Sequence, residues 1–353
     1  MIKNNPGHRI LELDVLRGLA AVSVLLFHYT TFYAIMYPQQ GTPLFNFPWV
    51  PLRTQLFAMI SGFVIIMIIE KNKSPLDFLV ARFSRIFPCY AAAVVLASIL
   101  IIMFKSLLIR VQPLDHAMVI SWPRFLIHFT MLQSWFGYLD IDNVYWYLAV
   151  EVSFYFIIFL FLVFKKTQHI EKMGFGVLIL VVINARYGGT PAVMIFSRML
   201  CFWQYFFAGI LFYNIKTKGD TWWRHAGLAM CFIVQNVISD DIYSVFCLAS
   251  DFLIFYFFIY GKLSWIVQRP LVFLGTISYS LYLIHLKLGY VIIKLLYMAG
   301  ANAWFRLIIP TLASIFIATI MTYFIEKPAR KFVQAKYTQW QQMKRRIGHG
   351  KFQ

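Results

Sequence analysis

Long apolar runs constrain the fold of this chain most, because they recur along almost its entire length. A helix of about 20 predominantly apolar residues spans the hydrocarbon core of a bilayer, which is about 30 Å thick. Hydrophobic residues make up 61% of the 353 residues and charged residues 13%, whereas an average globular chain is about half apolar and about one quarter charged. The runs therefore predict a polytopic membrane protein and not a soluble domain with one large core. About ten helices are expected, at residues 12–33, 53–70, 83–104, 146–164, 174–188, 193–213, 224–239, 242–260, 271–298 and 304–326.

The charges in the connecting loops predict how these helices are oriented. Every second loop is basic, and the intervening loops carry aspartates and fewer basic residues. Basic residues favour cytoplasmic loops, so both termini are expected in the cytoplasm, which requires an even number of spans. The expected fold class is all-α, a transmembrane helix bundle of about ten spans with both termini cytoplasmic. The basic loops contain Lys71, Lys73, Arg82 and Arg85; Lys165, Lys166 and Lys172; Lys216, Lys218 and Arg224; and Lys262 and Arg269.

The chain divides into one membrane-embedded domain, residues 1–335, and a basic cytoplasmic tail, residues 336–353, that we expect to be mobile. The first apolar run is too long for a cleaved signal peptide and lacks a small-residue cleavage site, so it is expected to remain as a helix. The location expected is the cell membrane, as a multi-pass protein, and the inner membrane if the source is bacterial. A homo-oligomer is compatible with the sequence.

Composition also bounds the partners of the protein. The net charge of +18 is scattered over short loops and forms no single basic patch, so it fits cytoplasmic loops and predicts no nucleic-acid partner. The four cysteines lie in or beside apolar runs without metal-ligand spacing, and no metal is expected.

The first expected helix carries ionisable residues within an apolar run. Arg17 and His28 are eleven positions apart, which places them within about 20° of the same helical face and about 16 Å apart along the axis. With Arg17 at the cytoplasmic surface, His28 lies near the middle of the bilayer, where an ionisable residue is costly and indicates a functional site. The alternative is a histidine whose hydrogen bond to a neighbouring helix only fixes packing. Asp14, three positions before Arg17, either orients the guanidinium group or faces water.

Two other apolar runs contain ionisable groups at depths that suit a site. Glu151 lies about a turn inside the outer surface, where it can hold a hydroxyl group of a ligand, tune a histidine or pair with an arginine such as Arg198. His285 lies about fourteen residues into its run, at a depth like that of His28. Serines and tyrosines near His285 suit the lining of a cavity, although helix packing explains the serines equally well. We interpret the aromatic residues of the outer loop, 105–145, as an interfacial belt, with a carbohydrate platform as the alternative.

Several short motifs follow one another in a fixed order. Arg17 and His28 form an Arg-x10-His pair; residues 57–63 read FAMISGF, 82–88 RFSRIFP, 146–151 WYLAVE, 278–285 SYSLYLIH and 326–330 EKPAR. In this combination the chain resembles the acyltransferase-3 family of membrane acyltransferases over nearly its whole length. It departs from the family pattern at Gln55, where an acid is frequent, and at Lys287, where a proline is common. Asp251, deep in the eighth run, has no place in the pattern.

The resemblance implies an integral membrane O-acyltransferase that transfers an acyl group, usually acetyl, from acyl-CoA to a hydroxyl of a carbohydrate. The partners expected are acyl-CoA (acetyl-CoA in most members), membrane lipid, and a surface polysaccharide, lipid-linked glycan or glycoside as acceptor. A sugar hydroxyl has too high a pKa to attack a thioester unaided, and the pKa of histidine suits a general base. His28 is expected in that role, with Glu151 and His285 in the same catalytic group; a covalent acyl-histidine is the alternative.

The donor is expected to bind through its phosphates. Arginine binds phosphate with bidentate, charge-assisted hydrogen bonds. Arg17, Arg82 and Arg85, at the cytoplasmic ends of the first and third helices, are therefore expected to hold acyl-CoA, with Asp14 beside Arg17. The positive-inside rule alone also explains basic residues at these two helix ends.

Two other classes of protein also bury polar residues in a helix bundle. A transporter or flippase for a glycan or lipid-linked glycan would line a permeation path with them, but such folds often have paired halves, and this sequence has no internal repeat. A non-catalytic scaffold gives no reason for His28, Glu151 and His285 to occur together.

Overall fold

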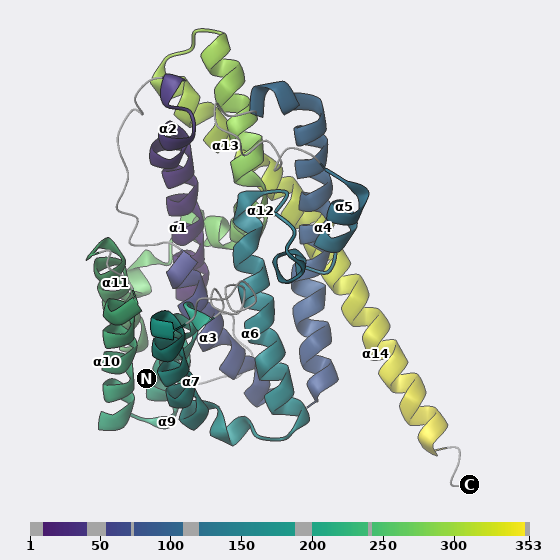
Figure 1. The fold of residues 1–353 in the computed structure, drawn as a ribbon. Helices are drawn as coiled ribbons and strands as arrows, with labels where there is room; N and C mark the ends of the chain where they lie inside the picture. Colours follow the sequence, from purple (N-terminus) through teal and green to yellow (C-terminus); the bar gives the residue numbers. More distant parts are fainter. Residues whose placement is uncertain are drawn as a thin grey trace.

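The computed structural model describes residues 10–40, 54–71, 74–108, 120–187, 200–238 and 242–349. Within these ranges every regular element is a helix, and the long helices pack side by side in one bundle (Figure 1). The all-α class expected from the sequence is therefore confirmed. The α-helices are α1 (Leu11–Phe27), α2 (Tyr33–Met36), α3 (Thr54–Lys71), α4 (Pro75–Leu108), α5 (Trp122–His128), α6 (Trp146–Val163), α7 (Ile170–Tyr187), α9 (Trp203–Lys218), α10 (Trp222–Ile238), α11 (Ile242–Ile259), α12 (Arg269–Met298), α13 (Ala303–Met321) and α14 (Lys327–His349).

Six helical segments of the described chain are long and apolar enough to cross a membrane. They are Leu11–Met36, Pro75–Leu108, Asn143–Val163, Ile242–Ile259, Arg269–Met298 and Ala303–Arg345, and the apolar helix Thr54–Glu70 is shorter. A multi-pass membrane protein follows from this set. The count of about ten spans and the cytoplasmic location of both termini stay predictions.

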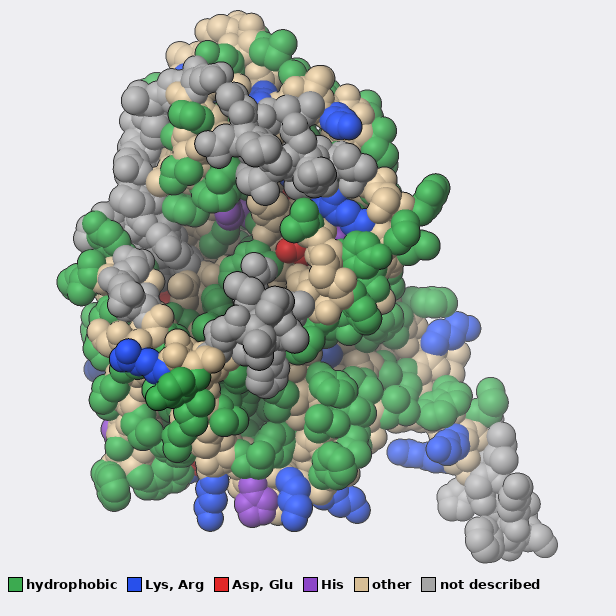
Figure 2. Space-filling model, viewed as in Figure 1, with side chains coloured by type: hydrophobic (Ala, Val, Ile, Leu, Met, Phe, Trp, Pro, Cys, Tyr) green, Lys and Arg blue, Asp and Glu red, His purple; other side chains and the backbone are tan. Residues whose placement is uncertain are grey.

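The surface of the bundle agrees with a lipid environment. Apolar side chains are spread over the described surface in one view, and lysine and arginine side chains line its lower edge and α14, with a few more near the top (Figure 2). Ile102 is 70% exposed and Phe316 65% exposed. Contiguous apolar surface of this kind is costly in water and is removed from water by lipid.

Helix α4 begins earlier than the apolar run predicts. The expected third span was 83–104, but α4 starts at Pro75, which occupies the first turn of the helix together with Asp77. Proline is favoured at the start of a helix because its missing N–H has no intrahelical partner there. A count of apolar residues does not detect the first turns of α4, because these turns are polar. As a consequence, Arg82 and Arg85 lie inside the helix and not at its end.

The end of the chain is helical where a mobile tail was expected. A π-helical segment, Thr322–Glu326, joins α13 to α14, and α14 continues to His349 (Figure 1). Asp77 of α4 accepts hydrogen bonds from Tyr337 Oη at 2.6 Å and Gln341 Nε2 at 2.8 Å. Residues 336–349 are therefore helical and contact α4 through Asp77, while their expected mobility and cytoplasmic location stay predictions.

Two close helix crossings bring the site-bearing helices together. A Cβ atom on Gly18 of α1 would lie 2.5 Å from the backbone nitrogen of Gly275 on α12. A Cβ atom on Gly62 of α3 would lie 2.0 Å from the carbonyl oxygen of Phe206 on α9. Only glycine permits such approaches of backbone to backbone. The Ser61-Gly62 pair of the sequence motif is thus a close helix contact.

Candidate active site

Two histidines from distant parts of the chain meet inside the bundle. His28 Nδ1 lies 2.9 Å from His285 Nε2, although the two residues are 257 positions apart. His285, on α12, is fully buried, and His28 is half-buried. His28 is the first residue of a π-helical segment, His28–Phe32, that follows α1. Such single π-turns are frequent at functional sites because they redirect the side chains of a helix.

The hydrogen bonds of His285 define the protonation pattern of the pair. His285 Nδ1 lies 2.8 Å from the carbonyl oxygen of Tyr282 and 3.1 Å from that of Leu281. A carbonyl only accepts, so in the neutral ring Nδ1 carries the proton and Nε2 carries the lone pair. His28 Nδ1 must then donate to His285 Nε2, which assigns the lone pair of neutral His28 to Nε2.

Tyr29 fixes the backbone of α12 at the same level. Its hydroxyl donates to the carbonyl oxygen of His285 at 2.6 Å and lies 2.8 Å from Ser314 Oγ on α13. A Cβ atom on Gly289 would lie 2.2 Å from the Tyr29 ring. Gly289 therefore leaves the space through which Tyr29 reaches the carbonyl of His285.

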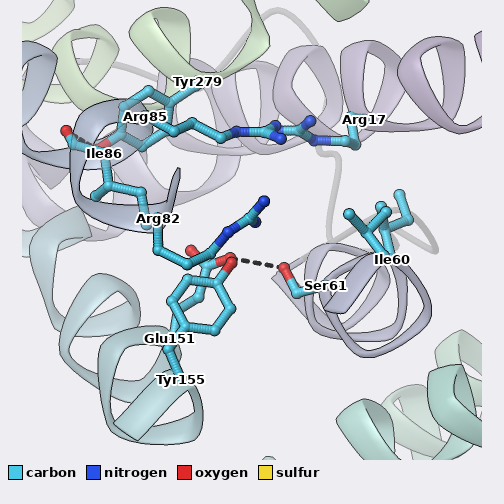
Figure 3. A pocket seen from close by; sticks show the side chains of 10 residues that line it. Arg17, Ile60, Ser61, Arg82, Arg85, Ile86, Glu151, Tyr155 and Tyr279 are labelled. Atoms are coloured by element: carbon cyan, nitrogen blue, oxygen red, sulfur yellow. Dashed lines mark hydrogen bonds between the residues drawn. The ribbon is translucent and has the colours of Figure 1, made fainter. Parts of the chain in front are cut away.

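A pocket lined by three arginines lies at another level of the same helices (Figure 3). The side chains of Arg17 and Arg85 extend toward one another, and Arg82 points into the same space (Figure 3). Among the described residues, none of these three arginines has a carboxylate within salt-bridge distance. The lining residues are Arg17, Ile60, Ser61, Val64, Arg82, Arg85, Ile86, Glu151, Tyr155 and Tyr279.

Glu151 is the carboxylate of this pocket. Its Oε1 accepts hydrogen bonds from Ser61 Oγ at 2.6 Å and from the Tyr155 hydroxyl at 2.5 Å. The guanidinium carbon of Arg82 lies 5.6 Å from the centre of the Tyr155 ring, and its buried Nε has no hydrogen-bond partner in the described part of the chain. The lining side chains carry three guanidinium groups and one carboxylate, and this excess of positive charge suits an anionic ligand. Two carboxylates outside the lining also attract these arginines: Asp14 attracts Arg17, and Glu326 attracts Arg17 and Arg85.

Glu151 lies inside the protein beside the arginines of α1 and α4, and its expected depth in the membrane stays a prediction. Residues 141–145, which precede α6, are largely buried: Ile141, Asp142 and Tyr145 have no exposed surface. Helix α6 therefore begins inside the protein. This start brings Glu151 to the arginines of α1 and α4.

Three aromatic rings lie between the pocket and the histidine pair. Phe57, Tyr147 and Tyr282 have ring centroids 5.7 to 6.3 Å apart, and Tyr282 is 6.0 Å from His285. Each ring is about one helical turn from a residue that lines the pocket. Tyr279 and His285, six positions apart on α12, are separated by about 9 Å along its axis. The arginine group and the histidine pair thus lie one after the other along the helix axes of one cluster.

The structure brings together six of the seven residues expected at the site, in two groups. His28 pairs with His285, while Arg17, Arg82, Arg85 and Glu151 line the pocket. Asp14 does not line it: the Asp14 backbone contacts Gly275, and its carboxylate attracts Arg17 from one turn away. Arg198, the alternative partner for Glu151, lies outside the described residues.

Sequence reasoning left two residues that shape these groups, Ser61 and Tyr279, with alternative interpretations, and it missed Tyr155 and Ser314. Ser61 lies in the FAMISGF motif and Tyr279 in SYSLYLIH, so the motifs contained a signal for both. Tyr155 follows Glu151 by four positions, the spacing of neighbours on one helical face. Ser314 is one of several hydroxyl residues in an apolar helix, and no local pattern distinguishes it.

No metal centre is formed by the residues that the structure describes: among them, no three or more His, Cys, Asp or Glu side chains are grouped so that they could hold an ion.

Comparison with known proteins places this arrangement in a family. A family model described as an acyltransferase domain matches residues 10–326, which include both groups of residues. Nodulation protein 10 of Rhizobium leguminosarum bv. viciae is 24% identical over 362 residues, an alignment that covers 93% of this chain and 95% of that protein. No solved structure matches the chain. The chain belongs to the acyltransferase-3 family, and the protein is a membrane acyltransferase that transfers groups other than amino-acyl groups.

Proposed function

We propose that this protein is an O-acyltransferase that takes an acyl group, acetyl above all, from acyl-CoA at the cytoplasmic side and transfers it to a carbohydrate hydroxyl. The acceptor is a surface polysaccharide, a lipid-linked glycan or a glycoside, and the protein resides in the cell membrane, the inner membrane if the source is bacterial. The single observation that carries the proposal is the bond of 2.9 Å between His28 and His285 in the same helix cluster as an arginine-lined pocket.

His28 acts as the general base in this proposal. Its Nε2 removes the proton from the acceptor hydroxyl as the oxygen attacks the thioester carbonyl. The tetrahedral intermediate then collapses: the C–S bond breaks, and the thiolate of coenzyme A takes the proton back from His28. Acceptor hydroxyl and acyl thioester are thereby converted into an acyl ester and a free thiol.

His285 is a positioning residue for this step. Its Nε2 accepts the Nδ1 proton of His28 and so keeps the lone pair of His28 on Nε2. The same bond stabilises the imidazolium that forms when His28 takes up a proton, as a carboxylate does in a serine-hydrolase triad.

The arginine-lined pocket is the proposed donor site. Arg17, Arg82 and Arg85 are not neutralised by described carboxylates at salt-bridge distance, and they can bind the phosphates of coenzyme A. Coenzyme A carries its thioester at the end of a long flexible arm, remote from these phosphates. A separation of about 9 Å between the levels of Tyr279 and His285 suits that geometry. Glu151 contributes by holding Ser61 and Tyr155 in the wall of this pocket.

Release of coenzyme A thiol by the purified protein in lipid nanodiscs tests the proposal. With acetyl-CoA and an acceptor glycan, we expect thiol release to depend on the acceptor and to match the ester formed, as measured by mass spectrometry. A protein that moves the glycan across vesicles without releasing thiol would be a transporter. Release of one equivalent of thiol in the absence of acceptor would indicate an acyl-histidine intermediate.

A further inference from the structure

A buried aspartate outside the helices holds the helix that carries His285. Asp142 lies in the segment before α6 and has no exposed surface. Its Oδ2 accepts a hydrogen bond from the backbone nitrogen of Lys287 on α12 at 3.2 Å, and its Oδ1 accepts one from Val144 at 3.4 Å. The side chain of Lys287 is also buried, and its charge attracts the carboxylate.

The same segment also forms a hydrogen bond with α12 on the other side of His285. The hydroxyl of Tyr282, three positions before His285, donates to the carbonyl oxygen of Val144 at 2.8 Å. The carbonyl of Tyr282 in turn accepts the Nδ1 proton of His285 at 2.8 Å. Contacts from residues 142–144 therefore bracket His285, at Tyr282 and at Lys287.

The segment that carries Asp142 is itself rigid. His128 Nδ1 donates to the carbonyl oxygen of Arg124 at 2.6 Å, and its Nε2 accepts from the backbone nitrogen of Ile141 at 2.9 Å. Arg124 binds the carbonyl oxygens of Leu139 at 3.0 Å and Asp140 at 2.7 Å. Burial lowers the pKa of His128 to about 4, so this support stays neutral at physiological pH.

A carboxylate at this position is costly, which argues against packing as its only role. Burial raises the pKa of Asp142 to about 6, partly offset by Lys287 and by the backbone N–H groups. An apolar or amide side chain would fill the space without that cost. Only an acceptor with two oxygens meets both the Val144 and the Lys287 N–H groups.

We propose that Asp142 is a positioning residue of the acyl-transfer site, which holds α12 so that His285 Nε2 stays in line with His28 Nδ1. The inference rests on the proposed function, because it assigns a task to the histidine pair. Asp142 touches neither the histidines nor the arginine pocket through any described hydrogen bond. Its effect on the rate is exerted through α12.

The variant Asp142→Asn removes one of the two acceptors. We expect kcat to fall by about 100-fold, the loss typical of a misplaced catalytic group, while the KM for acetyl-CoA stays within twofold. The control Glu171→Gln removes a carboxylate from a partly buried ion pair with Arg224 on other helices. Rates are normalised to folded protein, and the control should keep its kcat. An unchanged kcat in Asp142→Asn would overturn the inference.

The pH dependence separates positioning from loss of fold. The charged and titratable groups facing Asp142 are Lys287 and Tyr282 on α12, Tyr145 before α6, and Tyr29 after α1. Tyrosine and lysine side chains in water titrate near pH 10, far from the pH range of this test. At each pH, the kcat of the wild type is divided by the kcat of Asp142→Asn. The titration of His28 affects both proteins and therefore cancels in this ratio. We expect this ratio to shrink as the pH falls below about 6, where Asp142 is protonated; a ratio independent of pH would contradict the inference.

A double-mutant cycle completes the test. The pair Asp142→Asn and His285→Gln should be no slower than His285→Gln alone, because Asp142 acts through His285. Additive losses would overturn the inference. The proposed function is tested separately. Full activity of His28→Ala would contradict the proposed function. If His28→Ala is inactive and Asp142→Asn has wild-type activity, only the role of Asp142 is refuted.

Discussion

His28 Nδ1 lies 2.9 Å from His285 Nε2. The ninth expected apolar run, residues 271–298, thus supplies the hydrogen-bond partner for the histidine of the first run, residues 12–33. Carbonyl groups of its own helix hold the proton of His285 on Nδ1. The hydrogen bond between the two histidines then orients the imidazole of His28. This relationship converts a lone buried histidine into an oriented base. The predictions below test the pair, its support and the arginine pocket separately.

Removal of His285 should affect catalysis and not donor binding. In His285→Ala, His28 loses the acceptor that fixes its tautomer, and we expect kcat to fall by about 100-fold or more. The KM for acetyl-CoA should stay within twofold, because His285 does not line the arginine pocket. Steady-state kinetics in nanodiscs measures both values, and a large rise in KM at constant kcat would contradict the assignment.

Variants of the pocket arginines should weaken the use of donors that carry phosphate groups and leave a phosphate-free donor unaffected. Loss of a charge-assisted hydrogen bond in Arg82→Gln or Arg85→Gln should raise the KM for acetyl-CoA by about 10-fold to 100-fold. Acetyl-pantetheine, which has the thioester but no phosphate, should be used equally well by wild type and variants. The exposed Lys165→Gln serves as the control. Equal losses with both donors would show that the arginines act on folding and not on phosphate.

The space at Gly289 should be necessary for Tyr29 to reach His285. The Cβ atom of Gly289→Ala would overlap the Tyr29 ring, and overpacking of this kind costs about 1 to 3 kcal/mol of stability. Thermal unfolding in detergent should show the loss. In a Tyr29→Ala background, Gly289→Ala should cost no further stability, because the ring that its Cβ atom overlaps is absent, and kcat should stay low. Wild-type stability and activity in Gly289→Ala alone would contradict this packing.

Asp251 should be a site at which stability can be gained. It is fully buried in α11, and neither carboxylate oxygen has a hydrogen-bond partner in the part of the chain that the structure describes. An unpaired buried carboxyl is costly, so the apolar variant Asp251→Leu should raise the free energy of unfolding by about 1 kcal/mol or more. Glu70→Gln, at an exposed ion pair with Lys218, should change it less. A loss of stability in Asp251→Leu would show that the carboxyl group is needed.

The sequence was sufficient for properties that depend on local patterns. Apolar runs predicted the helical class and most helix positions. The shared helical face of Arg17 and His28 stays a prediction. The motifs marked Ser61 and His285 without indicating their partners. The family resemblance, carried by those motifs, was confirmed over residues 10–326.

Contacts between distant segments could not be predicted in this way. Glu151 lies beside arginines of α1 and α4, which are far from it in the sequence, and no local pattern indicated these neighbours. The polar first turns of α4 and the helical tail were missed, since apolar counting detects neither. Asp142 was read only as an outer-loop charge, and its contact with Lys287 joins residues 145 positions apart.

Acceptor-dependent thiol release by His28→Ala, compared with His169→Ala, tests the central claim most directly. His169 lies between α6 and α7, and its described hydrogen bond is to Gln168. Both variants are purified in nanodiscs and supplied with acetyl-CoA and acceptor glycan. We predict that His169→Ala releases thiol at the wild-type rate, whereas His28→Ala inserts and folds normally but releases none above the background without protein. Full acceptor-dependent release by His28→Ala would contradict the account.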